Sequence, residues 1–176
     1  MSAFEIKSAT LHDVVAIALL GRVTFNETFG HLFRDKNDLL RYHERTYSID
    51  KIEQSLQKPD NLFWIATVDR LPVAYAKLKL HSPTPFIANE HVCQLQKIYV
   101  LRDFLSMKIG YELQHQMIDK AAALGFEHIW LSVLNSNLRA IRFYERNSFG
   151  KVGEHKFQIG IEAFDFHAMA RPLNQD

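Results

Sequence analysis

The stretch that decides the fold is LQKIYVLRDFLSMKIGYEL, which runs from Leu95 to Leu113. Its first part predicts a strand, because β-branched and aromatic side chains such as Ile98, Tyr99 and Val100 suit a buried pleated surface. Its second part predicts a helix, because apolar residues recur at helical spacing, at positions 109, 113, 117, 121 and 124. We therefore expect a strand that passes through a short turn directly into a helix.

The start of this helix has the properties of an anion-binding site. The first N–H groups of a helix have no partner within it, and the helix dipole places positive charge at the same end. Gly110 lies in the first turn, where the missing side chain lets a bulky group approach the backbone. The layout predicts a site for a phosphate-bearing cofactor, although the local pattern alone fits equally well a unit that binds nothing.

The rest of the chain predicts one domain, 1–176, of mixed α/β type. Thr10 and Asp13 form a capping-box pattern in front of a helix that ends near Gly30, and a second helical region is expected over residues 38–56. The strand over 128–134 is too apolar to have a solvated face, which places it inside the sheet. The other expected elements are strands over 4–7, 62–68, 73–80, 92–100, 149–160 and 163–171, a loop over 81–91 and helices over 109–124 and 135–147.

The composition narrows the kind of protein. Lys and Arg number 21 against 20 Asp and Glu, so there is no electrostatic footprint for a nucleic-acid or membrane partner. No run of about 18 apolar residues occurs, which favours a soluble, cytoplasmic protein. The single cysteine, Cys93, excludes an internal disulfide and is expected to be a buried, unreactive thiol rather than a nucleophile. The nine histidines are scattered without the spacing of metal ligands, so no metal is expected.

A second stretch, VLNSNLRAIRFYERNSF from Val133 to Phe149, joins a strand to another helix. The two stretches resemble the acyl-CoA-binding motifs of the GNAT N-acetyltransferases. The first motif is a strand ending in Val, then x-Pro-x-Tyr-Arg, then Gly-x-Gly-x-Gly/Ala; the second is Asn-x-x-Ala-x-x-Phe-Tyr-Glu-Lys-x-Gly-Phe. The matching positions are Val100, Phe104, Ile109, Gly110, Asn137, Ala140, Phe143, Tyr144, Glu145 and Phe149. The differing positions are Arg102 for Pro, Leu105 for Arg or Gln, Ser106 and Lys108 for Gly, Arg146 for Lys and Ser148 for Gly.

The resemblance covers nearly the whole chain and implies the GNAT fold. That fold is α/β (α+β), with a mixed, mostly antiparallel central sheet of about six to seven strands and about four flanking helices. Two neighbouring strands splay apart, and the pantetheine arm of coenzyme A lies between them. Acetyl-CoA is the implied cosubstrate. The implied cofactor-binding residues are Ile98, Tyr99, Val100, Leu105, Ser106, Met107, Lys108, Ile109, Gly110, Asn137, Tyr144 and Arg146.

The resemblance also implies direct transfer of acetyl from the thioester to an amine. Backbone N–H groups around Ile98 to Val100 would stabilise the charge that develops on the thioester carbonyl. Asn137 would hydrogen-bond the pantetheine arm, and Tyr144 would be the catalytic acid that protonates the departing thiolate. The residues themselves leave other roles open, since Asn137 also suits a helix N-cap and Tyr144 also suits a packed core.

The residue that removes the proton from the amine is not evident from the sequence. Many relatives place a glutamate on the central strand, where this chain has Gln94 and Gln96, which cannot accept a proton. Glu27, near the end of the opening helix, is the first candidate for this catalytic role, followed by His81 and His91. A chain of water molecules without a dedicated base is the remaining alternative.

The partner is expected to be a small-molecule amine. The segment from Thr24 to Phe29 and the helical region after it resemble bacterial polyamine acetyltransferases over a short match, which suggests a polyamine. Acids of the opening helices would attract its positive charge, Glu27 first and Asp35 and Asp38 behind it. A non-catalytic acyl-CoA-binding sensor or partner-binding module on the same scaffold is the alternative, and either protein is compatible with a homodimer.

Overall fold

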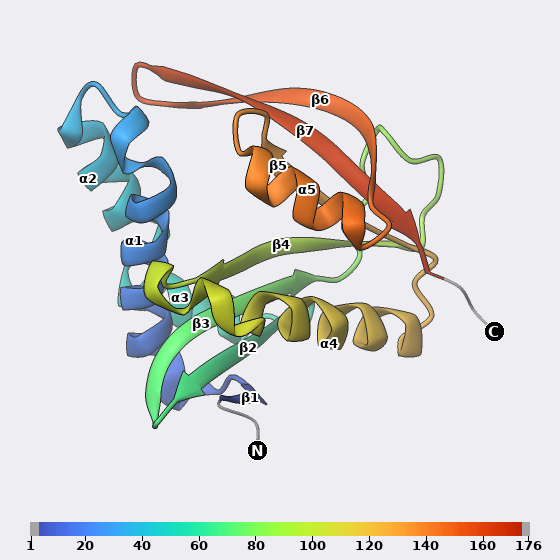
Figure 1. Cartoon of the computed structure of the whole chain (residues 1–176), viewed down its shortest axis with the longest axis horizontal. Helices are drawn as coiled ribbons and strands as arrows, with labels where there is room; N and C mark the ends of the chain where they lie inside the picture. The colour runs from blue at the N-terminus through green and yellow to red at the C-terminus, as the bar shows by residue number, and fades with distance from the viewer. Residues whose placement is uncertain (1–3, 174–176) are drawn as a thin grey trace.

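The computed structural model describes residues 4–173, which form a seven-stranded sheet with helices on both faces (Figure 1). The strands are β1 (Glu5–Ser8), β2 (Asn61–Val68), β3 (Leu71–Lys79), β4 (Val92–Val100), β5 (His128–Leu134), β6 (Gly150–Ile159) and β7 (Glu162–Pro172). The α-helices are α1 (Val14–Phe29), α2 (Lys36–Thr46), α3 (Ile49–Leu56), α4 (Ile109–Ala123) and α5 (Leu138–Arg146). Short 3-10 helices cover Leu11–Asp13, Gly30–Leu32 and Arg102–Met107.

The sheet opens between its two central strands. The strand order is β1-β2-β3-β4-β5-β7-β6, and every neighbouring pair is antiparallel except β4 with β5. The parallel pairing of β4 with β5 runs only from Val92 with His128 to Gln94 with Trp130. Beyond that point the two strands continue without pairing to one another. The predicted splayed strand pair is therefore confirmed.

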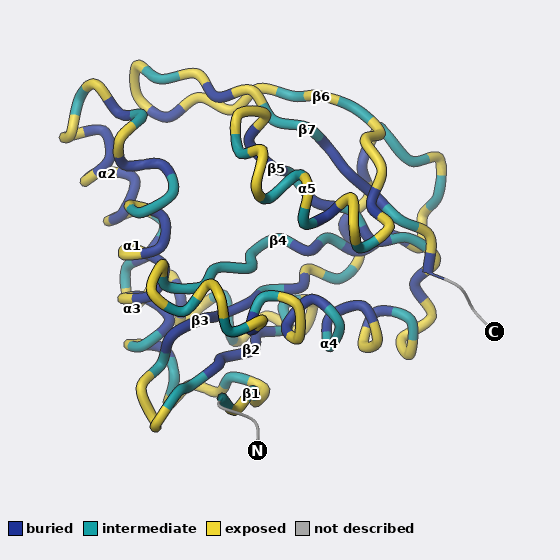
Figure 2. The backbone as a smooth tube through the Cα atoms, in the orientation of Figure 1, coloured by how far each residue is buried: buried dark blue, intermediate teal, exposed yellow. Residues whose placement is uncertain are grey.

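Two hydrophobic cores hold the layers together, one on each face of the sheet. The core beneath α4 and α5 includes the fully buried Leu113 and Met117. The core on the opposite face, beneath α1, includes Ile17 and Phe25. The buried stretches in Figure 2 follow the central strands and the inner sides of α1 and α4. No helix within residues 4–173 has the length and apolar character that crossing a membrane requires.

Several local predictions are confirmed. The bounds of β4 and β5 are those expected, and β5 lies inside the sheet. The Thr10 hydroxyl accepts a hydrogen bond from the His12 N–H, and the Asp13 carboxylate accepts one from the Thr10 N–H at 2.9 Å, which completes the capping box. Gly125 follows the end of α4 with a φ of +86°, a conformation that favours glycine. Cys93 is fully buried, and burial raises the pKa of its thiol to about 12, as an unreactive cysteine requires.

The helical region expected over residues 38–56 is present, but it consists of two helices. Two helices, α2 and α3, occupy this part of the chain and brief non-helical backbone separates them. Tyr47 ends α2, and the Ser48 hydroxyl caps α3 by accepting a hydrogen bond from the Lys51 N–H at 3.2 Å. The described residues consequently contain five α-helices rather than the expected four or so.

Two helix boundaries also differ from expectation. The helix expected from residue 135 begins at Leu138, because Asn137 occupies its N-cap. Gly30 lies at the C-cap of α1 as predicted, but with a right-handed φ of −56°, and the chain continues as a 3-10 turn. A Cβ at this position would meet the amide end of the Asn26 side chain, which would have to turn away to make room for it.

Candidate functional site

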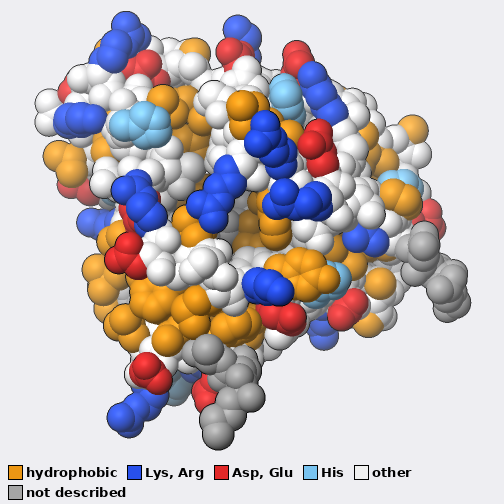
Figure 3. Space-filling view, in the orientation of Figure 1, with side chains coloured by type: hydrophobic (Ala, Val, Ile, Leu, Met, Phe, Trp, Pro, Cys, Tyr) orange, Lys and Arg blue, Asp and Glu red, His pale blue; other side chains and the backbone are white. Residues whose placement is uncertain are grey.

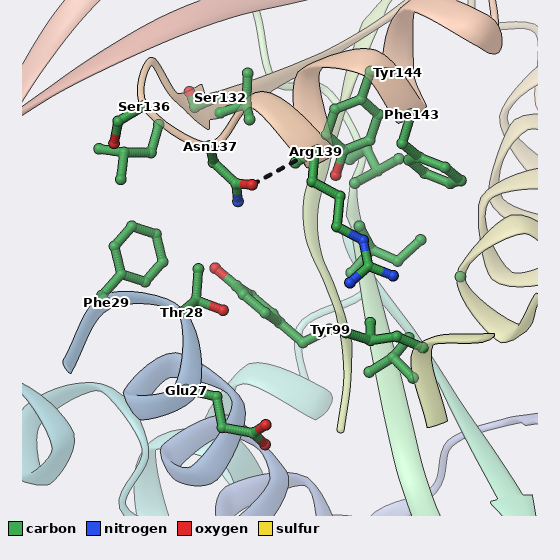
Figure 4. A pocket seen from close by; sticks show the side chains of 18 of the residues that line it. Glu27, Thr28, Phe29, Tyr99, Ser132, Ser136, Asn137, Arg139, Phe143 and Tyr144 are labelled. Carbon is green, nitrogen blue, oxygen red and sulfur yellow. Dashed lines mark hydrogen bonds between the residues drawn. The ribbon is translucent and has the colours of Figure 1, made fainter. Parts of the chain in front are cut away.

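A cavity of about 960 Å³ lies at the opening between β4 and β5 (Figure 4). Its walls come from both faces of the sheet, since Phe143 and Tyr144 pack in the core beneath α4 and α5, whereas Phe29 and Phe166 pack in the core beneath α1. The cavity therefore passes through the sheet, and it has an α4 side and an α1 side. A volume of this size suits a small-molecule or cofactor ligand.

On the α4 side, the cavity meets the first turn of α4. Gly110 lines the cavity there, and Lys108 occupies the N-cap position with a left-handed φ of +62°. Glycine adopts this left-handed conformation without strain, which explains why the motif described above usually has its middle glycine at this position. The chain instead places a lysine, with its positive charge, at the start of the helix.

Basic side chains gather around the cavity on this face of the molecule (Figure 3). Among residues 4–173, the Lys and Arg side chains that line the cavity are those of Arg102, Lys108, Arg139 and Arg146. They add full positive charges to the partial positive charge of the α4 N-terminus. This end of the cavity is therefore suited to the phosphate groups of a cofactor.

The edge of β4 directs backbone N–H groups into the opening. The N–H of Leu101 donates to the carbonyl of Val73 at 2.9 Å, which sets the alternation of the β3–β4 ladder. Alternate residues of an antiparallel strand point their N–H groups toward the partner strand and away from it. Ile98 and Val100 therefore point theirs toward the side where β5 no longer pairs with β4. Donors in this position can stabilise a carbonyl oxygen that gains negative charge.

The turn from β5 into α5 positions Asn137 at the cavity. Its side-chain oxygen accepts a hydrogen bond from the Ala140 N–H at 3.2 Å, so the alternative role of N-cap is confirmed. The amide group also faces the cavity, across from the ring of Tyr99 (Figure 4). The cap fixes the orientation of this amide and leaves its nitrogen turned toward the cavity.

Tyr144 lies on α5 with its hydroxyl directed into the cavity, beside the side chain of Arg139 (Figure 4). Burial raises the pKa of the Tyr144 hydroxyl well above its ordinary value. The hydroxyl consequently keeps its proton through the physiological pH range and is suited to donate it rather than to accept one.

Glu27 lies in the last turn of α1 and lines the cavity. Its carboxylate accepts a hydrogen bond from the backbone N–H of Arg102 at 3.0 Å and lies 3.4 Å from the guanidinium Nε of the same residue. The Arg102 guanidinium also donates to the Glu27 carbonyl at 3.1 Å. This acid is thus already paired with a positive charge, and the pair ties α1 to the segment that follows β4.

The other predicted acids do not line the cavity, contrary to expectation. Asp35 caps α2 by accepting a hydrogen bond from the Asn37 N–H at 2.9 Å. Asp38 pairs with Arg41 and accepts a hydrogen bond from the Ile161 N–H at 2.9 Å. Both side chains therefore serve the local structure, and Asp38 holds the β6–β7 hairpin against α2.

The two histidines considered as bases also lie away from the cavity. The ring of His81 packs against Phe126 with 5.1 Å between centroids, and His91 is exposed. Of the two glutamines on β4, Gln96 lines the cavity, whereas the side chain of Gln94 accepts a hydrogen bond from the Ser82 hydroxyl at 3.1 Å. Within residues 4–173, no group of three His, Cys, Asp or Glu side chains is placed to hold a metal ion.

Most predicted site residues meet at this one cavity. Those that line it are Glu27, Ile98, Tyr99, Val100, Leu105, Lys108, Gly110, Asn137, Tyr144 and Arg146. Ser106, Met107 and Ile109 do not line it, and Ile109 is fully buried in the core beneath α4.

Sequence reasoning missed several residues of the cavity wall. Arg139 could have been found, because it lies two residues after Asn137 in the second motif, on the first turn of the same helix. Ser132 and Phe166 carried no such signal. Their place at the cavity depends on the order of β5, β7 and β6 in the sheet, which no local pattern reveals.

Two half-buried lysines face each other on the α1 side of the sheet. Lys77 on β3 and Lys97 on β4 are direct cross-strand partners. The Lys97 amine donates to the Tyr47 hydroxyl at 3.3 Å and lies 5.3 Å from the centre of that ring. Burial lowers the pKa of each lysine to about 8, and for Lys77 the charges of neighbouring lysines act in the same direction. Both amines therefore titrate much closer to neutral pH than ordinary lysines do.

Comparison with known sequences gives a consistent result. The sequence model of the acetyltransferase (GNAT) family matches residues 26–149. An uncharacterised N-acetyltransferase in the pepI 3′ region of Lactobacillus delbrueckii subsp. lactis is 24% identical over 160 residues, which cover 91% of this chain and 92% of that protein. An uncharacterised N-acetyltransferase of Mycobacterium bovis is 31% identical over 80 residues, which cover 46% of this chain and 51% of that protein.

Solved structures share the fold at low sequence identity. The crystal structure of PaiA N-acetyltransferase from Thermoplasma acidophilum in complex with coenzyme A has a TM-score of 0.76 and 19% identity, covering 96% of this chain and 98% of that one. The ribosomal-protein-S18-alanine N-acetyltransferase of Escherichia coli has a TM-score of 0.72 and 20% identity, covering 98% and 96%. At these identities the likeness concerns the arrangement of strands and helices.

Proposed function

The chain belongs to the GNAT acetyltransferase family and is an acetyl-CoA-dependent N-acetyltransferase, and we propose that it acetylates the primary amine of a small molecule by direct attack. The observation that carries this proposal is the cavity that passes through the sheet between β4 and β5. Its α4 side is positively charged, whereas its α1 side has aromatic walls from Phe29 and Phe166. Two different substrates can thus reach one point from opposite faces.

The residues on the α4 side suit coenzyme A. Lys108, Arg139 and Arg146 offer charge to its phosphates, and the backbone N–H groups at the start of α4 offer hydrogen bonds. Gly110 keeps this approach open. Bound acetyl-CoA supplies a thioester, which is an acyl group activated toward an amine.

Residues on the two sides of the cavity then assist different steps of the transfer. The amine nitrogen attacks the thioester carbonyl carbon, a C–N bond forms and the C–S bond breaks. The N–H groups of Ile98 and Val100 stabilise negative charge on the carbonyl oxygen. Tyr144 gives its proton to the departing sulfur and regains one from solvent, while the proton of the nitrogen leaves on the α1 side.

A polyamine is the acceptor class that we propose to test first. The short resemblance over Thr24 to Phe29 supports it, and so does the place of Glu27 on the cavity wall. Glu27 is also the one acid among the described residues that line the cavity, and Arg102 already pairs with it. Attraction of a polycation would therefore depend on this single carboxylate.

An acceptor screen tests the proposed function. The protein is incubated with acetyl-CoA and, in separate reactions, spermidine, spermine, free amino acids, an aminoglycoside and short peptides with free N-termini. Release of the coenzyme A thiol is followed together with the mass of the product, and we expect equal amounts of thiol and acetylated amine with at least one small amine. Tight acetyl-CoA binding by calorimetry without turnover of any amine would favour the non-catalytic acyl-CoA-binding module instead.

A further inference from the structure

We propose that Ser132 and His155 form a proton relay that takes the proton from the acceptor nitrogen on the α1 side of the cavity. This inference rests on the proposed function and assigns the residue for proton removal that the sequence left open. The two side chains are joined by a hydrogen bond of 2.8 Å between the Ser132 Oγ and the His155 Nε2.

The contact joins two strands that are not neighbours. Ser132 lies on β5 and His155 on β6, and β7 runs between them. Strands two places apart are separated by about 10 Å, so a side chain must reach across the middle strand. The residue of β7 beside Ser132 is Ala168, whose cross-strand partner on β6 is Gly153. The small Ala168 leaves room for the imidazole to lie over β7 and reach the serine, whereas the ring of Phe86 packs against Gly153.

The relay lies on the side from which an acceptor would enter. Residues paired across a sheet share a face, and the pairing of Leu134 with Phe166 and of Phe166 with His155 places all three on the α1 side. Ser132 and Phe166 line the cavity, and the His155 ring stacks on Phe166 with 5.4 Å between centroids and 10° between planes. His155 is only half-buried, so its far nitrogen can pass a proton to water.

The other polar groups at the cavity are poorly suited to take this proton. Glu27 is paired with Arg102, and Gln96 has no basic atom. Tyr144 and Tyr99 keep their own protons, because burial raises the pKa of both hydroxyls. His31 also lines the cavity and is exposed, so it is the one competing imidazole among the described lining residues.

The charged neighbours of His155 lie mostly on the other face. Glu154, Lys156, Asp165 and His167 adjoin the stacked pair along β6 and β7, and pleating turns them away from the α1 side. There Lys156 pairs with Asp165, and His167 lies 3.8 Å from Glu154. The titratable and charged groups that line the cavity itself are Glu27, His31, Tyr99, Arg102, Lys108, Tyr111, Arg139, Tyr144 and Arg146.

The relay balances the protons of the reaction. When His155 carries its own proton on Nδ1, the Ser132 hydroxyl donates to Nε2. The acceptor amine is an ammonium at neutral pH, and it passes a proton to the Ser132 oxygen while the serine proton moves to Nε2. The resulting imidazolium releases its Nδ1 proton to water, and a shift of tautomer restores the starting state. The neutral amine then attacks the acyl carbon, and the second surplus proton of the nitrogen leaves by the same route once the C–N bond has formed. Ser132 would touch the acceptor, whereas His155 acts through Ser132 and is a positioning residue.

Kinetics across pH 6 to 9 test this proposal, with spermidine as acceptor or, if it is inactive, the best amine of the screen. We expect Ser132→Ala and His155→Ala each to lower kcat about a hundredfold at pH 7, the usual contribution of a base. Their rates should approach the wild-type rate as pH rises, because free amine becomes abundant.

The double variant should be no slower than either single variant, and Ser132→Thr should restore most activity. The affinity for acetyl-CoA should stay unchanged in all of these variants. His167→Ala, an imidazole on the opposite face of β7, is the matched control and should keep the wild-type profile.

Several outcomes would overturn the relay. One is a Ser132→Ala protein whose kcat depends on pH as the wild type does. Another is a change in the low-pH part of the kcat profile in His31→Ala that is absent from Ser132→Ala. A direct readout is the nitrogen NMR spectrum of labelled imidazole, which should show His155 with its proton on Nδ1, and a proton on Nε2 in the neutral ring contradicts the proposal. If the wild-type protein acetylates no amine, the proposed function fails first and the relay fails with it.

Discussion

The carboxylate of Glu27 accepts a hydrogen bond at 3.0 Å from the backbone N–H of Arg102, a residue 75 positions further along the chain. The guanidinium of Arg102 returns to the same carboxylate and to the Glu27 carbonyl, so one residue pair joins the end of α1 to the segment after β4. These two segments flank the cavity from its two sides. The pair can therefore serve acceptor attraction, cofactor binding or simply the shape of the site, and variants separate these roles.

Glu27→Gln keeps the shape and can still accept the Arg102 N–H, but it removes the charge. If the carboxylate attracts a cationic acceptor, we expect the acceptor KM to rise about tenfold, equivalent to about 1.4 kcal/mol, with unchanged folding and acetyl-CoA affinity. Arg102→Gln is the matched variant, because it breaks the same pair and leaves the carboxylate in place. Steady-state kinetics that show the same defect in both variants would make the pair structural. Rescue of Glu27→Gln at high pH would assign proton removal to Glu27 and contradict the Ser132–His155 relay.

Gly110→Glu should block the cofactor at the start of α4. A carboxylate there meets the phosphates of coenzyme A, and we expect calorimetry to show acetyl-CoA affinity lowered by well over tenfold, that is, by more than about 1.4 kcal/mol. Gly110→Ala is the control, because an added Cβ would lie 3.7 Å from a methyl group of Val100, an ordinary contact. A folded Gly110→Glu protein with unaltered affinity would place the phosphates elsewhere.

Lys108 combines a charge with a left-handed backbone, and two variants separate these properties. Lys108→Gly and Lys108→Ala both remove the amine, so both should weaken acetyl-CoA binding and reduce its dependence on salt. Alanine retains the cost of the left-handed conformation, so it should be less stable than glycine by about 1 kcal/mol. Chemical denaturation measures this difference. Equal stabilities would show that the conformation at position 108 does not select for glycine.

Tyr144→Phe should lower kcat about a hundredfold and leave acetyl-CoA affinity nearly intact, because the hydroxyl acts mainly when charge develops on sulfur. Since burial raises the pKa of Tyr144, its ionisation should cause no loss of wild-type rate up to about pH 9. Single-turnover kinetics with saturating acetyl-CoA measure the effect. Tyr111→Phe, at an exposed tyrosine on the cavity rim, provides the comparison. Wild-type turnover by the Tyr144→Phe protein would leave this hydroxyl a packing role only.

Lys97→Met should stabilise the fold at neutral pH. Burial lowers the pKa of Lys97 from 10.5 to about 8, so the unfolded chain binds the additional proton between these values. The free energy of unfolding of the wild type should therefore rise with pH from about 8 to 10.5 and lack this contribution below pH 8. A shift of one pKa unit corresponds to about 1.4 kcal/mol. Because Lys97 keeps some contact with solvent, we expect Lys97→Met to raise the free energy of unfolding at pH 7 by only about 2 kcal/mol. Denaturation of Lys79→Met, at an exposed lysine of the same sheet, should show no such gain, and equal changes in both variants would contradict the assignment.

Local sequence determined most of the elements of this protein. The β-branched and aromatic residues at the end of 92–100, the capping box at Thr10 and Asp13, and the glycine after α4 each involve residues close together in the chain, so their physics can be read from short patterns. The same is true of the cap at Asn137 and of the start of α4 at Lys108. These local features, together with the two motifs, predicted the fold and most of the α4 side of the cavity.

Tertiary structure alone decided the α1 side of the cavity. The pairing of Glu27 with Arg102 depends on how α1 lies against the end of β4, and the contact of Ser132 with His155 depends on β7 lying between β5 and β6. Contacts of this kind join residues whose separation in the chain bears no relation to their distance in space. Such contacts form only when the strands have taken their order in the sheet, so neither periodicity nor a local motif can predict them.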